Sequence, residues 1–216
     1  TLTYIIPHKI KPESGENPSN NKIVVLGDIH GEFESLLAIL RYNKIIDEKN
    51  KWNFGDGQIV FTGDVFDRGD KVTECLWFIF QLEIQAKKQG GMVHYLLGNH
   101  EMMALLFDDR YVVDKYQHAA HYIHFHYSHF FDKHSVLGKW LRSKNTIVRI
   151  GEQLFVHGGI HEDMANLDLS LQQINTKAKA YYRQMYFPGV ADKVTEALIS
   201  TETGLAWYRG YFKGDV

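Results

Sequence analysis

Carboxylate, guanidinium and imidazole side chains follow short apolar runs at four places in the 216-residue chain. The richest of these stretches has the sequence GDVFDRG (residues 63–69) and carries two carboxylates and a guanidinium directly after an apolar run. The other three are GDIHG (residues 27–31), GNHE (residues 98–101) and HGG (residues 157–159). Because ligands collect at the carboxyl ends of strands in open parallel sheets, we expect the four stretches to meet at one site.

The donor atoms in these stretches suit a pair of transition-metal ions. Carboxylate, amide and imidazole groups without thiolates are typical ligands of zinc, manganese or iron. The four stretches supply such groups from Asp28, His30, Asp64, Asn99 and His157. Asp64, at the end of a middle strand, can give one oxygen to each ion. Two ions about 3.5–4 Å apart can hold a hydroxide and clamp a phosphoryl group for in-line attack.

Further side chains in the same stretches predict phosphate binding and acid catalysis. Arg68 offers a planar fork that matches phosphate oxygens. His100 directly follows Asn99, so it can lie beside the ions without binding them and protonate a leaving oxygen, with Asp67 polarising its ring. Two neighbouring acids are interpreted as structural: Asp70 as a helix N-cap, and Glu101 without a ligand role.

Strands and helices alternate over the first hundred residues, which indicates an α/β architecture with a partly parallel sheet. Apolar runs predict strands, the last two joined as a hairpin, at residues 22–26, 58–62, 92–97, 146–150 and 153–156. Apolar residues at helical spacing predict helices at residues 32–43, 72–89, 167–187 and 194–200. Another short helix is expected to begin near Glu101.

The remaining segments predict a lead-in loop and a helical cap within one domain, residues 22–216. Residues 1–21 hold three of the four prolines and have no periodic apolar pattern. Residues 110–144 are expected to be mostly helical, and their histidines and aromatics are interpreted as a cap over the active site. The alternative is an aromatic core with hydrogen-bonded histidines. A metal-binding tract is disfavoured because no carboxylate or cysteine pattern accompanies His118, His121, His124, His126, His129 and His134.

Composition narrows the classes of partner. The formal charge of −2 gives no general attraction to nucleic acid or anionic lipid, and no apolar run approaches the roughly 18 residues that span a bilayer. We therefore expect neither nucleic acid nor a membrane as a partner. The single cysteine, Cys75, excludes an internal disulfide. The chain begins at Thr1, so the compartment stays open: cytoplasm, or periplasm or secretion if a signal peptide was removed.

Together, the four motifs resemble the phosphoprotein phosphatase family of the calcineurin-like metallophosphatases, over about residues 22–160. The run DRYV at residues 109–112 and residues 205–211 are similar to the Shewanella-like protein phosphatases. The resemblance implies a β-sandwich flanked by helices. It also implies two metal sites that share one carboxylate: Asp28, His30 and Asp64 on one ion, and Asp64, Asn99 and His157 on the other.

The resemblance further implies roles for four side chains around the phosphate. His100 is the expected general acid, paired with Asp67, while Arg68 and Arg209 are the expected phosphate-binding arginines. One departure stands out, because family members take a further ligand from a histidine downstream of the second arginine, and none follows Arg209 here. We therefore expect a longer or nicked protein whose C-terminal fragment completes the second sheet and one metal site, and an exposed strand edge without that fragment.

These features predict a dinuclear metal-dependent phosphatase that acts on phosphoproteins, at Ser/Thr or Tyr, or on small phosphomonoesters. The expected reaction is in-line attack of metal-bound hydroxide with His100 as general acid. One alternative is a dinucleoside-polyphosphate hydrolase, which shares the motifs but cleaves an anhydride. Another is a non-catalytic metal- or phosphate-binding scaffold, against which the His100–Asp67 pair argues, since binding alone needs no proton donor.

Overall fold

The computed structural model describes residues 6, 10–19, 22–182 and 192–213, and within these ranges the strands form two three-stranded sheets. The first sheet is entirely parallel, with its strands in the order β2 (Ile23–Leu26), β3 (Gln58–Phe61) and β4 (Met92–Tyr95). This arrangement confirms the predicted parallel sheet.

The second sheet is mixed, with its strands in the order β1 (Glu16–Asn17), β5 (Ile147–Ile150) and β6 (Gln153–Val156). β5 and β6 pair antiparallel, which confirms the hairpin, and β1 runs parallel to β5. The expectation of a plain loop over residues 1–21 was therefore wrong at β1. Two residues carry too little periodic pattern to reveal a strand, and this one exists only through its pairing with β5.

The parallel strands end level with one another, which brings three motifs to one edge of the sheet. Leu26, Phe61 and Tyr95 are neighbours in the register of β2, β3 and β4. The next residues of each strand lead into GDIHG, GDVFDRG and GNHE, respectively. All four residues of the central strand β3 are buried, as expected for a parallel strand covered on both faces.

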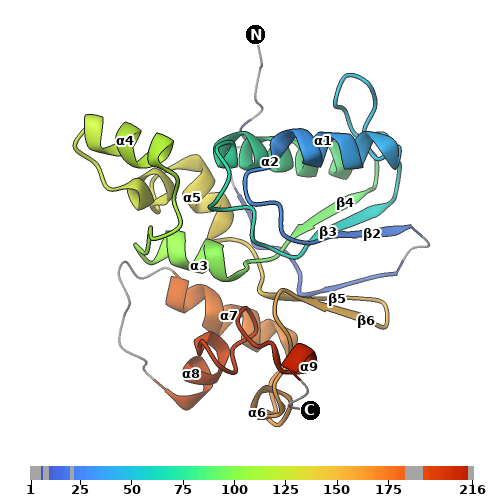
Figure 1. Ribbon diagram of the computed structural model, residues 1–216. Helices are drawn as coiled ribbons and strands as arrows, with labels where there is room; N and C mark the ends of the chain where they lie inside the picture. Colours follow the sequence, from blue (N-terminus) through green and yellow to red (C-terminus); the bar gives the residue numbers. More distant parts are fainter. Residues whose placement is uncertain (1–5, 7–9, 20–21, 183–191, 214–216) are drawn as a thin grey trace.

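The two sheets pack face to face as a sandwich, and helices cover the outer face of the first sheet (Figure 1). Val60, Leu96, Val148 and Ile150 form the apolar layer between the sheets. On the other side of the parallel sheet lie α1 (Phe33–Tyr42) and α2 (Val72–Lys88), which bury apolar side chains in the main core. The predicted sandwich flanked by helices is confirmed.

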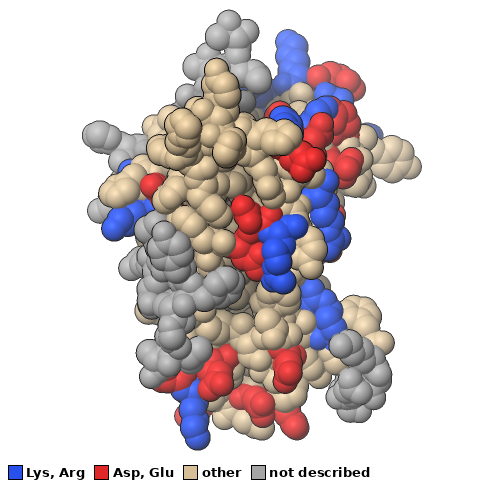
Figure 2. Space-filling model, turned by 60° about the vertical axis from the view of Figure 1, so that its left-hand side comes forward, with Lys and Arg blue, Asp and Glu red and all other residues tan. Residues whose placement is uncertain are grey.

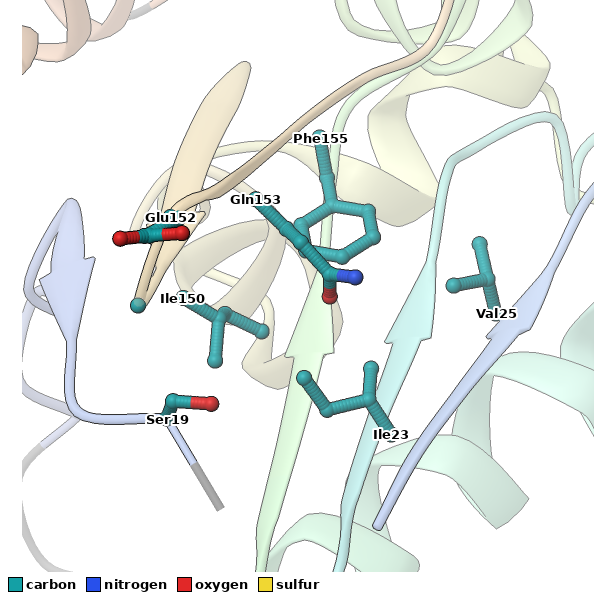
Figure 3. Close-up of a pocket in the computed structure, with 8 residues that line it drawn as sticks. Ser19, Ile23, Val25, Ile150, Glu152, Gln153 and Phe155 are labelled. Atoms are coloured by element: carbon teal, nitrogen blue, oxygen red, sulfur yellow. The ribbon is translucent and has the colours of Figure 1, made fainter. Parts of the chain in front are cut away.

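A cavity of about 620 Å³ opens between the sheets at their edge strands, β2 and β6 (Figure 3). Val25 of β2 and Phe155 of β6 line it, and Val25 is 48% exposed. An exposed apolar strand at a sheet edge can pair with a further strand. Among the described residues β2 and β6 are edge strands, and the expectation that a C-terminal fragment covers this edge stays a prediction.

The other helices lie mainly in the second half of the chain, and their bounds are α3 (Asn99–Leu105), α4 (Asp114–Tyr122), η1 (Tyr127–Phe131), α5 (Val136–Leu141), α6 (Glu162–Ala165), α7 (Leu171–Tyr182), α8 (Lys193–Ile199) and α9 (Gly210–Lys213). The helix expected over residues 167–187 begins only at Leu171, and its end past residue 182 lies outside the described residues. Within the described ranges, no helix has the length and apolar character to cross a bilayer.

The expected N-cap of α2 was wrong. Lys71, not Asp70, occupies the N-cap position, and its own side chain makes no capping hydrogen bond. Asp70 instead contributes its backbone carbonyl, which accepts hydrogen bonds from the Lys115 ammonium and, at 3.0 Å, from the Tyr116 hydroxyl. The start of α2 is therefore tied to α4, a contact that local sequence does not reveal.

For the histidine-rich segment, the alternative of an aromatic core with hydrogen-bonded histidines holds only in part: Tyr116, Tyr127 and Phe131 join the main core, whereas most of the histidines lie on the surface. Four of the six histidines are exposed: His118, His121, His124 and His134. The other two, His126 and His129, pack against the ring of Phe107. The role of residues 110–144 as a cap stays a prediction.

On the face shown in Figure 2, basic and acidic side chains lie beside one another, and uncharged residues cover much of the remaining surface. The electrostatic potentials of neighbouring opposite charges largely cancel at a distance. Charges separated by more than about 8–10 Å are also screened at physiological salt. The described residues of this face therefore form no broad basic surface of the kind that tracks a nucleic-acid backbone.

Candidate active site

Several site residues have a backbone conformation that residues other than glycine rarely adopt. His30, Asp64, Asp67 and Arg68 have φ angles of 46°, 55°, 67° and 65°. Such left-handed residues cost free energy and persist only where surrounding contacts hold them. Backbone hydrogen bonds tie two of the turns together, because the N–H groups of residues 29 and 30 both donate to the carbonyl of Asp64 at 2.9 Å.

A single buried carboxylate, Glu101, holds the GDVFDRG and GNHE turns. It accepts hydrogen bonds from the backbone N–H groups of Asp64 at 2.7 Å, Val65 at 2.8 Å and Gly98 at 2.8 Å. The hydroxyl of Tyr95 donates to it at 2.9 Å. Burial and the charge of Asp64 raise the pKa of Glu101, and the donated backbone hydrogen bonds oppose that rise. Glu101 is thus a structural residue that fixes the site from beneath.

Asp64 lies at the centre of three imidazoles. Its Oδ2 atom is 3.3 Å from Nε2 of His157, 3.9 Å from Nε2 of His100 and 4.0 Å from Nε2 of His30. Burial by itself would raise the pKa of Asp64, but the hydrogen bond and charge of His157 outweigh it and lower that pKa below its ordinary value. A buried carboxylate surrounded in this way can serve more than one cation.

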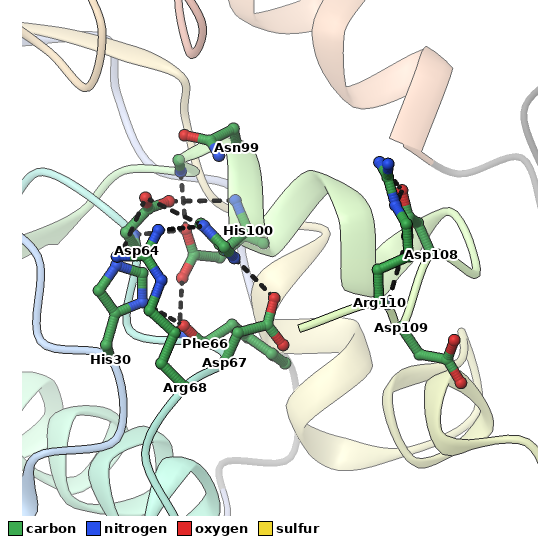
Figure 4. Close-up of polar contacts among 12 residues, drawn as sticks. His30, Asp64, Phe66, Asp67, Arg68, Asn99, His100, Asp108, Asp109 and Arg110 are labelled. Atoms are coloured by element: carbon green, nitrogen blue, oxygen red, sulfur yellow. Dashed lines mark hydrogen bonds and ion pairs between the residues drawn. The ribbon is translucent and has the colours of Figure 1, made fainter. Parts of the chain in front are cut away.

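His100 and Asp67 form a buried pair beside this carboxylate (Figure 4). Nδ1 of His100 donates to Oδ2 of Asp67 at 2.6 Å, and both side chains are almost fully buried. Burial lowers the pKa of His100, but the hydrogen bond to Asp67 and the charge of Asp64 raise it above its ordinary value overall. On the opposite side of the ring, Nε2 lies 3.3 Å from Nη2 of Arg68.

Arg209 reaches the same cluster from the far end of the chain. Its Nη2 atom is 3.2 Å from Nε2 of His157 and 3.5 Å from Oδ1 of Asn99. Gly158 makes room for it, because a Cβ atom there would lie 2.6 Å from Nη1 of Arg209. The guanidinium thus lies at the HGG turn, and its signal in the sequence was the resemblance of residues 205–211 to the Shewanella-like protein phosphatases.

All nine predicted site residues lie in one cluster, with Asp28 at its exposed rim. Asp28 Oδ2 is 3.8 Å from Nε2 of His30, and Oδ1 of Asn99 is 3.0 Å from Nε2 of His157. Sequence reasoning missed one neighbour, Tyr111, whose ring centroid lies 5.3 Å from that of His100. The available signal was its place in the DRYV run soon after GNHE.

Comparison with known proteins agrees with this geometry. The profile of the calcineurin-like phosphoesterase family matches residues 21–200. The chain belongs to the calcineurin-like phosphoesterase family. The predicted likeness to Shewanella-like protein phosphatases within it is also confirmed. Shewanella-like protein phosphatase 1 of Plasmodium berghei (strain Anka) is 34% identical over 165 residues, which cover 74% of this chain and 44% of that protein.

Two further relatives extend the comparison. The crystal structure of a cold-active protein-tyrosine phosphatase of a psychrophilic Shewanella species matches with a TM-score of 0.89 and 41% identity, over 94% of this chain and 61% of that one. A symmetrical bis(5'-nucleosyl)-tetraphosphatase of Actinobacillus succinogenes is 29% identical over 170 residues, 74% of this chain and 55% of that protein. The chain thus spans about half of each relative's length.

The family implies divalent metal ions, and the residues present fit them. The Nδ1–H of His30 donates to the carbonyl of Phe66 at 2.7 Å, so its Nε2 atom carries a lone pair. That Nε2 atom is buried without a hydrogen-bond partner. A buried lone pair that faces carboxylate oxygens is costly unless a cation satisfies both. Among the described residues, possible ligand atoms lie within 4.8 Å of one another in two sets: His30, Asp64 and His100, of which His100 is the predicted acid; and Asp28, Asp64 and His157.

His157 is arranged in the same way. Its Nδ1 atom lies 3.0 Å from the carbonyl of Thr62, so Nδ1 donates and Nε2 is turned toward Asp64 and Asn99. Burial lowers the pKa of His157, but the hydrogen bond and charge of Asp64 raise it overall. A proton or a metal ion can satisfy this Nε2 atom, and the two compete. The division of Asp28, His30, Asp64, Asn99 and His157 between two ions stays a prediction.

Proposed function

We propose that this chain is the phosphatase part of a metal-dependent phosphomonoesterase acting on phosphorylated protein side chains. The observation that carries the proposal is the buried His100–Asp67 pair, 2.6 Å apart, with the Arg68 guanidinium 3.3 Å from the outer nitrogen of His100. A proton donor beside a phosphate-binding fork is the arrangement that cleavage of a phosphate ester requires. The similarity to a protein phosphatase and a protein-tyrosine phosphatase supports the phosphoprotein substrate.

In this proposal each side chain has one task. Arg68 and Arg209 bind phosphoryl oxygens through their planar forks. Asp67 fixes the imidazole of His100 through Nδ1, and Nε2, which accepts from Arg68 in this structure, would carry the proton for the leaving oxygen once the guanidinium turns to the phosphate. Asp28, His30, Asp64, Asn99 and His157 would hold the ions. When bound, the metal ions would polarise the phosphoryl group and lower the pKa of water.

The test compares two substrates in the presence of manganese. p-Nitrophenolate is a stable anion that leaves without a proton, whereas phenolate needs one. We expect turnover of both p-nitrophenyl phosphate and phenyl phosphate by the parent chain. His100→Asn should lower kcat on phenyl phosphate by about 10²–10⁴ and kcat on p-nitrophenyl phosphate much less, with unchanged metal content by mass spectrometry.

His121→Asn is the matched control, because His121 is exposed on α4 and should keep parental rates. Equal losses on the two substrates would contradict the assignment of His100 as the acid. An inactive chain that holds its metals would support the non-catalytic scaffold. An inactive chain with fewer than two metals would instead indicate that the expected C-terminal fragment supplies a ligand.

A second candidate function is hydrolysis of a dinucleoside polyphosphate, which the similarity to a bis(5'-nucleosyl)-tetraphosphatase supports. Diadenosine tetraphosphate tests it directly. If kcat/KM for this anhydride is well above that for phosphotyrosine and phosphoserine peptides, the dinucleoside polyphosphate becomes the assigned substrate in place of phosphoproteins. Comparison of kcat/KM between the phosphotyrosine and phosphoserine peptides would show which phosphorylated side chain the site prefers.

A further inference from the structure

The loop between α3 and α4, residues 106–113, touches both groups that the proposed reaction places next to the ester. Its backbone holds Arg68, whose N–H donates to the carbonyl of Tyr111 at 3.1 Å. Because Arg68 has a left-handed φ of 65°, this hydrogen bond helps to stabilise a costly conformation. The side chain of Tyr111 lies against the imidazole of His100, with ring centroids 5.3 Å apart and planes inclined by 57°.

Two aromatic rings lie against His100 and differ in exposure. The ring of His30, whose centroid is 4.8 Å from that of His100, belongs to the cluster around Asp64. Tyr111 is 50% exposed, whereas His100 itself is only 2% exposed. Tyr111 thus offers an exposed aromatic side chain in contact with the proposed proton donor, where a group attached to the protonated oxygen can meet it.

Contacts within the loop hold Tyr111 in place. Arg110 pairs with Asp108 through two hydrogen bonds of 2.8 and 2.6 Å (Figure 4). Asp109 lies 3.3 Å from Nε2 of His126, and the His126 ring stacks on Phe107. A side chain fixed before the substrate arrives loses little conformational entropy on binding. These contacts order the loop that carries Tyr111, so its exposed side chain is presented by a preformed backbone.

We propose that Tyr111 contacts the leaving group and determines which leaving groups the site prefers. The inference rests on the proposed phosphomonoesterase function, and it assigns specificity to a residue outside the predicted metal, acid and phosphate groups. An aromatic leaving group gains a ring-to-ring contact with Tyr111, typically worth a few-fold to tenfold in affinity. A leaving group of one or two carbons does not reach it.

Binding of non-hydrolysable phosphonates tests the inference without turnover. Benzylphosphonate replaces the ester oxygen of phenyl phosphate by a CH₂ group, and methylphosphonate lacks the leaving-group body. With manganese present, calorimetry should show that Tyr111→Ala weakens benzylphosphonate about fivefold to tenfold and leaves methylphosphonate unchanged. Tyr111→Phe should keep the parental ratio. Kinetically, Tyr111→Ala should raise KM for phenyl phosphate, with kcat and the Ki of inorganic phosphate unchanged.

Tyr122→Ala is the control, since this tyrosine of α4 is 86% exposed and should change neither dissociation constant. An unchanged ratio of the two constants in Tyr111→Ala would overturn the inference. Equal weakening of both phosphonates is one such case, and it would mean that Tyr111 acts only on Arg68 or the fold. If the parent chain binds neither phosphonate, the proposed function itself fails.

Discussion

At the scale of single residues, Glu101 shows how one side chain can connect two motifs. Every group that faces its carboxylate is a hydrogen-bond donor: three backbone N–H groups within 2.8 Å and the hydroxyl of Tyr95 at 2.9 Å. An ionised carboxylate offers only acceptors, so it matches this set. The glutamate that follows His100 in GNHE is therefore selected by the loop geometry and not by the metal ions.

Glu101→Gln should destabilise the protein by about 3 kcal/mol, because the amide NH₂ would face donors and leave buried N–H groups unpaired. Urea unfolding measures the change. The exposed Glu196 of α8 supplies a matched control, and Glu196→Gln should stay within about 0.5 kcal/mol of the parent. If Glu101→Gln unfolds at the parental urea concentration, the carboxylate is not what holds the two turns.

At the scale of elements, the parallel sheet contains a buried histidine that is paired with a glutamine on the neighbouring strand. His94 of β4 is 2% exposed and its Nε2 atom lies 2.8 Å from Oε1 of Gln58 on β3. The amide nitrogen of Gln58 donates to the carbonyl of Pro18 at 2.9 Å, so its Oε1 atom is the acceptor for His94. Burial, and then the charge of Lys144, lower the pKa of His94 to about 4.

This pair predicts a loss of stability in mild acid. Above about pH 6.5, the ordinary pKa of histidine, His94 is neutral in both states and its contribution is complete. As the pH falls from 6.5 toward 4, the unfolded chain binds a proton that the folded chain does not, so the free energy of unfolding decreases. The part due to His94 between pH 7.5 and 5 is about 2 kcal/mol.

Urea unfolding at pH 7.5 and at pH 5 measures this loss. His94→Gln should remove most of that part of the loss, whereas His134→Gln, at an exposed position, should leave it unchanged. The same pH dependence in the parent and in His94→Gln would show that other groups cause the acid effect.

At the scale of the whole molecule, the site is a junction of segments that are far apart in sequence. Its predicted residues come from the ends of β2, β3 and β4, from the turn after β6 and from residue 209, just before α9. Arg209 and Asn99 are 110 residues apart in sequence and lie within 3.5 Å. The candidate metal ligands Asp28, Asp64 and His157 are likewise brought together only by the fold, so a metal ion that they hold binds only the folded chain and should stabilise the entire fold.

Manganese at about one hundred times its dissociation constant should therefore increase the free energy of unfolding by about 3 kcal/mol. For a chain of this size, that corresponds to an increase in Tm of about 5–10 °C. Calorimetry with manganese and with a chelator measures the shift. His157→Asn should lose much of the shift and His134→Asn should retain it. A shift of parental size in His157→Asn would exclude that imidazole as a ligand.

Sequence alone was enough for the chemistry that depends on local pattern. Each apolar run followed by glycine and a polar group marks the end of a strand, and parallel strands of equal length end together. The GDIHG, GDVFDRG and GNHE stretches could therefore be assigned to one edge of a sheet. Residue type then indicated which of their side chains suit metal ions, phosphate or a proton.

Tertiary structure alone decided the features that depend on contacts between distant segments. The two-residue strand β1 exists only beside β5, and Asp70 binds α4 instead of capping α2. Glu101 supports the turns because five residues converge on it in space, and Tyr111 lies on His100 because the loop after α3 folds back over Arg68. Such contacts leave no periodicity in the chain, since their free energy comes from partners brought together by the fold and not from neighbours in sequence.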